Sequence, residues 1–120
     1  MSEPRLDGRT VKGSVGLSNN EHLHFHGQHL RHERTGVHGY LEILHDDTLL
    51  TYDQFNFDRH ADRLRIANAA HKLLDDNPMT DSGKPYTSML LKHDVDLFCR
   101  QAWEVWNGQF EGVELEGDVI

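Results

Sequence analysis

The sequence is short of cysteine, of basic residues and of long apolar runs, and each shortage excludes a class of protein. The single cysteine, Cys99, allows neither an internal disulfide nor a zinc site built from cysteines, so we expect a reducing, cytoplasmic setting. Twelve lysines and arginines oppose 20 acidic residues, and the formal charge of −8 disfavours nonspecific binding to nucleic acid or to an anionic membrane. No apolar run reaches the roughly 18 residues of a membrane span, and no signal-peptide pattern opens the sequence.

The sequence does contain enough apolar residues, 37% of 120, for the core of one domain. Period-two alternation prevails in residues 11–57 and helical spacing in residues 58–109. We therefore predict an α+β fold in which an antiparallel meander of three to five strands packs against two C-terminal helices. Residues 1–10 are interpreted as a flexible lead, 11–110 as the single domain and 111–120 as an acidic tail.

The first hairpin is predicted from a run that alternates histidine with apolar residues. This run, His22–His26, is followed by Gly27-Gln28, which fits a two-residue type II′ turn. The resulting register pairs Phe25 with Leu30 and leaves the polar side chains on the other side of the hairpin. A short strand over residues 11–17 is expected to complete the meander.

A second hairpin is predicted from residues 37–44 and 49–55, with its turn at Asp46-Asp47. Alternation places one set of its side chains toward the core. The residues expected to point inward are Leu41, Ile43, Leu50 and Tyr52.

Two helices are expected in the C-terminal half. The first is predicted to have Asp58 as its N-cap and to end before Pro78, and the second to be capped by Thr87 or Ser88. Two apolar stripes on the second helix cover more of its circumference than one sheet contact uses, so this helix is either central or in contact with another molecule. The face of the first helix comprises Ile66, Ala69, Ala70, Leu73 and Leu74; the stripes of the second comprise Leu91, Val95, Phe98, Ala102 and Val105, and Cys99, Trp103, Trp106 and Phe110.

Histidine is far more frequent than usual: ten occur, seven of them within residues 22–45. Alternate residues of a strand project to one side, so His24 and His26, with His29 across the predicted turn, form a candidate metal site. The alternative interpretation is the solvent face of a strand with adventitious zinc or nickel affinity. No other cofactor is expected.

The run His22–His26 also resembles the histidine-triad motif of nucleotide hydrolases and transferases, although Gly27-Gln28 replaces the two apolar residues that continue that motif. This resemblance implies a hydrolase. A separate hypothesis treats the predicted hairpin, His22–His32, as a pH sensor that changes stability or partner affinity between about pH 7.5 and 5.5. Protonation of all ten histidines would raise the formal charge of −8 by ten units.

No motif for nucleophilic catalysis or nucleotide binding accompanies these histidines. The sequence has no glycine–serine–glycine elbow, and Gly83-Lys84 lacks the upstream glycine and the following serine or threonine of a phosphate loop. We therefore predict that the protein is not an enzyme.

Scattered segments of the chain resemble the region that precedes the ATPase domain in RecA-like, phage-type replication or recombination ATPases. These segments are Arg34–Gly39, Tyr52–Asn56, Asp62–His71, Phe98–Arg100 with Trp103, and Glu114–Asp118. The resemblance spans residues 11–118, and the ATPase domain itself is absent. It implies an accessory or docking module of nucleic-acid machinery that has no nucleotide site of its own.

Taken together, these features predict a non-enzymatic interaction module of phage or mobile-element type. It is expected to bind a protein partner, or itself as a dimer, through Trp103, Trp106 and Phe110, because buried aromatic side chains contribute most to binding at interfaces. Three alternatives stay open. Both tryptophans belong to the core; the chain is an acidic inhibitor that blocks a nucleic-acid-binding enzyme; or it is a histidine-dependent metal-binding protein or hydrolase.

Overall fold

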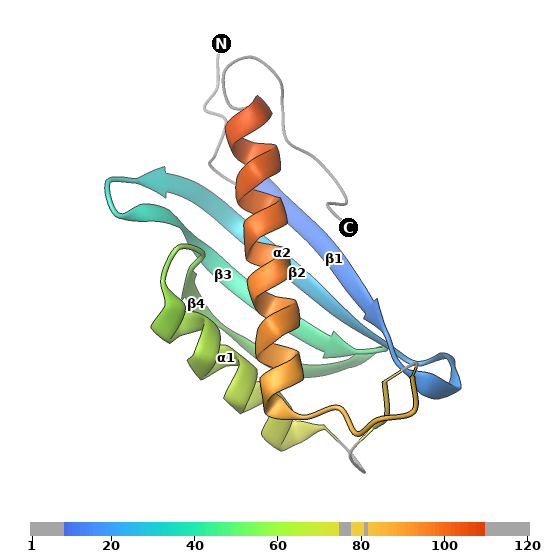
Figure 1. Cartoon of the computed structure of the whole chain (residues 1–120). Helices are drawn as coiled ribbons and strands as arrows, with labels where there is room; N and C mark the ends of the chain where they lie inside the picture. Colours follow the sequence, from blue (N-terminus) through green and yellow to red (C-terminus); the bar gives the residue numbers. More distant parts are fainter. Residues whose placement is uncertain (1–8, 75–77, 81, 110–120) are drawn as a thin grey trace.

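The structure is a computed structural model that describes residues 9–74, 78–80 and 82–109. Within these residues four strands are followed by two helices (Figure 1). The strands are β1 (Arg9–Gly16), β2 (His22–Glu33), β3 (Gly36–His45) and β4 (Thr48–Asn56), and a 3₁₀ turn, η1 (Ser18–Asn20), joins β1 to β2. The helices are α1 (His60–Leu73) and α2 (Ser88–Gln109). This order confirms the predicted α+β fold with the helices after the strands.

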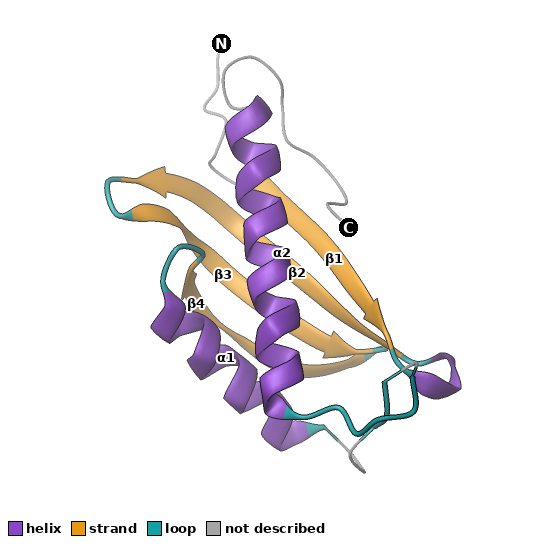
Figure 2. Ribbon diagram, viewed as in Figure 1, coloured by secondary structure: helices purple, strands orange, loops and turns teal. Residues whose placement is uncertain are grey.

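The strands form one antiparallel sheet in the order β1-β2-β3-β4, so every strand pairs with its neighbours along the chain. Both helices lie on one side of this sheet, with α1 beside β4 and α2 crossing in front of the strands (Figure 2). We name that side the covered face and the opposite side the open face. Among the described residues, no helix or strand lies over the open face.

The core lies between the covered face and the helices, because alternate strand residues point toward α1 and α2. Three buried aromatic rings join the layers: Phe25 of β2 lies 5.5 Å from Phe98 of α2, and Phe57 lies 6.1 Å from Phe98, measured between ring centroids. Full burial of a phenylalanine side chain contributes about 1.5–3 kcal/mol, so these contacts hold α2 on the sheet. Other fully buried residues include Val11, Leu23, Leu30, Leu41, Ile43, Ile66, Leu91 and Val95.

The predicted hairpin around Gly27-Gln28 is wrong, because β2 runs on through these residues. The pairing of β2 with β3 shifts between Gln28 and Arg31, where His29 adopts a φ of 55° within a β-bulge. Gly27 serves close packing instead of a turn, since a Cβ atom there would lie 2.7 Å from Cζ of Phe57. His29 therefore lies further along the same strand.

The two hairpins of the sheet turn at other places. β2 and β3 are joined at Arg34-Thr35, followed by Gly36 with a φ of 124°, which glycine adopts readily. The second predicted hairpin is confirmed, with its turn at Asp46-Asp47. A register shift between β3 and β4 puts Tyr52 on the open face, 44% exposed, although it was predicted to point inward. The other three predicted inward residues are buried: Leu41, Ile43 and Leu50.

Helix α1 begins at His60, so the prediction that Asp58 is its N-cap is wrong. The carboxylate of Asp58 instead accepts a hydrogen bond of 3.2 Å from the backbone N–H of Val37, which ties the start of β3 to the chain before α1. The predicted apolar face is confirmed in part: Ile66 and Ala70 are buried and Leu74 packs against the core, whereas Leu73 is exposed. Ala67, which was not predicted, is also buried.

Helix α2 has the predicted cap, because Oγ1 of Thr87 accepts a hydrogen bond of 3.2 Å from the backbone N–H of Leu90. Burial raises the pKa of the Cys99 thiol to about 12, so this side chain is an unreactive part of the core.

Neither helix within the described residues is long and apolar enough to cross a membrane. Arg9 and Thr10, placed in the lead by the sequence, belong to β1; the rest of the predicted lead and the acidic tail 111–120 lie outside the described residues.

Candidate functional site

The predicted anchors on α2 are placed only in part. Trp103 is half buried and packs against the core, where it borders a cavity of about 10 Å³ together with Leu30, Phe57 and other apolar residues. This position gives Trp103 an intramolecular role. The side chain of Trp106 and the whole of Phe110 lie outside the described part of the structure, so the prediction for these two residues stays a prediction.

The predicted histidine site is only partly assembled. His24 and His26 project from the open face as the alternation predicts, with ring centroids 6.4 Å apart. His29 lies within the bulge, and its ring packs nearly perpendicular to that of Tyr40, with the two ring centroids 6.1 Å apart. In the described residues, these three histidines are not among the groups whose ligand atoms converge within 4.8 Å.

His26 takes part in a polar network that crosses from β2 to β3. Its Nδ1 atom lies 3.0 Å from Oε1 of Glu42, and the side-chain amide of Gln28 donates a hydrogen bond of 3.1 Å to the same oxygen. Glu42 is thus held by two partners on the neighbouring strand, and about a fifth of its side chain, 22%, is exposed. The network orders the middle of the open face.

Two tyrosines stack beside this network. The rings of Tyr40 and Tyr52 lie 5.3 Å apart and are within 10° of parallel. They come from diagonal positions on β3 and β4, because Tyr40 pairs with Gln54 and Glu42 pairs with Tyr52. Together with Leu49, which is 53% exposed, they supply the apolar surface of the open face.

A cleft of about 340 Å³ lies next to Tyr40 and reaches from the sheet to α1. We name it the arginine cleft, because three of the chain's 12 basic residues line it. Arg31 comes from β2, Arg59 from the residue before α1, and Arg65 from the second turn of α1. The remaining polar side chains of the cleft are His38, Tyr40, Gln54, Asn56 and Asp62. A chain with a net negative charge thus gathers positive charge at one place.

The arginines of the cleft differ in their own contacts. Arg65 is clamped, with Nη1 2.6 Å from the carboxylate of Asp53 and Nη2 donating a 2.8 Å hydrogen bond to the carbonyl of Gln54. Asp62 accepts a hydrogen bond from the backbone N–H of Asn56 and lies 3.8 Å from Arg65. The exposed side chain of Arg59 makes no hydrogen bond or ion pair with any described residue. Arg59 is therefore the cation of the cleft that is most available to a ligand.

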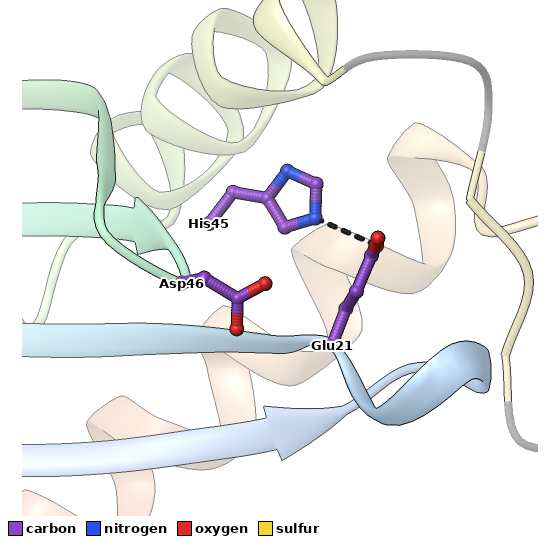
Figure 3. Close-up of side chains that lie close together, drawn as sticks. All are labelled: Glu21, His45 and Asp46. Carbon is purple, nitrogen blue, oxygen red and sulfur yellow. Dashed lines mark hydrogen bonds and ion pairs between the residues drawn. The ribbon is translucent and has the colours of Figure 1, made fainter.

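A second polar cluster, which the sequence analysis missed, lies at the opposite end of β2. Glu21, His45 and Asp46 place one ligand atom each within 4.8 Å of one another (Figure 3). Nε2 of His45 lies 2.9 Å from Oε1 of Glu21. The signal in the sequence was the pair of dipeptides Glu21-His22 and His45-Asp46, which become neighbours only when β2 and β3 pair over their full length.

A partly buried polar pair belongs to the covered side. The hydroxyl of Tyr86 donates a hydrogen bond to the carboxylate of Asp94 where α2 begins. Burial raises the pKa of Asp94, against the lowering effect of this hydrogen bond, and burial also raises the pKa of Tyr86. The pair fixes the loop before α2 to the helix.

Comparison of the chain with models of known protein families, with curated proteins and with solved structures finds no match in any of the three.

Proposed function

We propose that the protein is a non-enzymatic docking module of nucleic-acid machinery and that it holds a protein partner on the open face of its sheet and along the border of that face with α1. The arginine cleft is the observation that carries this proposal. Tyr40 belongs both to the cleft and to the stacked tyrosine pair, so positive charge and apolar surface adjoin. The link to nucleic-acid machinery rests on the sequence resemblance described above.

The partner segment that fits this surface is acidic. An arginine guanidinium can bind a carboxylate with two parallel hydrogen bonds, and Arg31 and Arg59 carry such groups at the cleft. A cleft of about 340 Å³ suits one or two side chains. A protein segment also offers apolar side chains to Tyr52 and Leu49, whereas a nucleic-acid strand would meet a chain with a formal charge of −8.

Fluorescence anisotropy with three labelled probes tests the proposal: oligoglutamate, oligolysine and oligothymidylate. Wild-type protein is expected to bind oligoglutamate, and Arg59→Glu is expected to weaken that binding about tenfold, since it removes one attraction and adds one repulsion. The matched control is Arg100→Glu, which makes the same charge change at an exposed position on α2. Equal effects of the two variants, or tighter binding of oligothymidylate than of oligoglutamate, would overturn the proposal.

The same probes separate this function from that of an acidic inhibitor. An inhibitor that imitates nucleic acid binds basic proteins, so oligolysine would bind best and Arg59→Glu would strengthen the complex. Opposite signs for one substitution therefore distinguish the two functions.

The α2 surface predicted from the sequence has its own test. If Trp106 is an anchor for self-association, Trp106→Glu converts a dimer to a folded monomer, measured by light scattering and circular dichroism. If Trp106 is a core residue, the same variant loses its fold, and the interface prediction is then wrong.

A further inference from the structure

We propose that Glu21, His45 and Asp46 form a zinc site at the end of the sheet, independent of the arginine cleft. Their three ligand atoms already lie within 4.8 Å of one another. Around a tetrahedral zinc ion with bonds of about 2.0–2.1 Å, ligand atoms are separated by about 3.4 Å, so small side-chain rotations bring them to binding distance. Figure 3 shows the three side chains coming from two segments, His45 and Asp46 from the end of β3 and Glu21 from just before β2.

The backbone around the three residues is fixed by contacts that do not depend on a metal. The carbonyl of Glu21 accepts a 2.7 Å hydrogen bond from the N–H of Leu17, which holds the end of η1. The N–H of Asp46 donates a 2.8 Å hydrogen bond to the carbonyl of His22, and one oxygen of the Asp46 carboxylate accepts a 3.1 Å hydrogen bond from the N–H of His22. The ligands are thus held near their binding positions in advance, and the second oxygen of Asp46 is left for the ion.

The donor set favours zinc over the alkaline-earth ions. One imidazole nitrogen with two carboxylates is a set that zinc accepts, and three protein ligands leave a fourth position for water. Calcium needs six to eight oxygen ligands, and magnesium requires octahedral oxygen coordination. His45 is the key ligand because its side chain is only 14% exposed and its Nε2 atom already points at Glu21.

The outer histidines provide the competing explanation for any zinc binding. His22, His24 and His26 lie in a row on the open face, with neighbouring rings 6.1 and 6.4 Å apart. His45 lies on the covered side of the sheet instead, because it follows the inward-pointing Ile43 by two residues. Substitution of one set leaves the other intact, so the two can be separated.

Isothermal titration calorimetry with zinc chloride on the full, untagged chain tests the proposal. Wild type and the double variant His24→Gln with His26→Gln are expected to bind one equivalent of zinc with equal affinity. His45→Gln and Asp46→Asn are each expected to weaken binding by more than about a hundredfold. Asp46→Asn keeps an oxygen for the N–H of His22, so it remains informative if His45→Gln fails to fold.

Three results would overturn the zinc site. Zinc affinity that survives His45→Gln and Asp46→Asn but is lost in the double variant assigns the metal to the open face. An absence of saturable binding by wild type removes the site altogether. Tighter binding of calcium than of zinc would contradict the assignment of zinc as the metal. Circular dichroism of every variant with a chelator present confirms that each is folded before titration.

Discussion

The covered and open faces of the sheet are built from the same strands but differ in what they specify. In β2, Leu23 and Phe25 point to the helices and are fully buried, while His24 and His26 point the other way and stay in contact with solvent. The covered face consists of apolar side chains whose burial drives folding. The open face consists largely of polar and aromatic side chains that remain in contact with solvent. The buried apolar core is therefore on the covered face, whereas the proposed partner surface lies on the open face and along its border with α1.

The largest test of this contrast is a pair of neighbouring substitutions in β2. Phe25→Ala removes a buried ring that contacts Phe98 and is expected to lower the free energy of unfolding by about 3–5 kcal/mol. His24→Ala, one residue away on the open face, is expected to change it by less than about 0.5 kcal/mol. Urea unfolding followed by circular dichroism measures both.

Phe25→Leu serves as the graded control, because it keeps most of the apolar volume and is expected to cost less than Phe25→Ala. Similar losses for His24→Ala and Phe25→Ala would mean that the open face is also core, covered by something that the described residues do not include.

The next effect tests the close contact between β3 and the bulge of β2. Gly39 of β3 lies under the bulge of β2, and a Cβ atom there would lie 2.7 Å from the carbonyl oxygen of Gln28. Because a backbone oxygen cannot rotate away, Gly39→Ala is expected to cost about 1–3 kcal/mol in urea unfolding. Ser14→Ala, at an exposed position of β1, is the control. A neutral Gly39→Ala would contradict the bulge.

A smaller effect concerns the helix that covers the sheet. Thr87→Ala removes the side-chain oxygen that caps α2 and is expected to cost about 1 kcal/mol, whereas Thr87→Ser is expected to retain the cap. Thermal unfolding of the two variants measures the difference. Equal stability of the alanine and serine variants would show that the hydrogen bond to Leu90 contributes nothing to the anchoring of α2.

The fold was predictable because period and order are local properties of the sequence. Alternation in residues 37–44 and 49–55 predicted the second hairpin, and helical spacing in residues 91–110 predicted α2. The first hairpin was wrong because Gly27-Gln28 satisfies turn chemistry as well as close packing. Only the tertiary contact with Phe57 decides between the two uses, and a single sequence does not contain that contact.

The candidate sites were less predictable because each depends on register. Arg31, Arg59 and Arg65 come from three segments, and they meet only when β2 runs past the bulge and α1 lies along β4. Likewise Glu21 and His45 become neighbours only when β2 and β3 pair along their length. A turn at Gly27 would separate the arginines of the cleft and would also separate Glu21 from His45. One error in the predicted strand pattern therefore hid both sites.

The smallest expected effect concerns Asp94 on the covered side and the way in which the free energy of unfolding depends on pH. Burial raises the pKa of Asp94 above its usual 3.8, so the folded chain keeps this proton at pH values where the unfolded chain has lost it. The contribution of Asp94 to stability is therefore fully present below its usual pKa of 3.8, and it is lost as the pH rises through the pKa of the folded state. Asp94→Asn removes the titration and leaves an oxygen to accept from Tyr86. In urea unfolding, the stability of Asp94→Asn relative to wild type should rise across this pH window. The exposed control Asp47→Asn should show no such rise. Parallel curves for wild type and Asp94→Asn would mean that Asp94 is not desolvated.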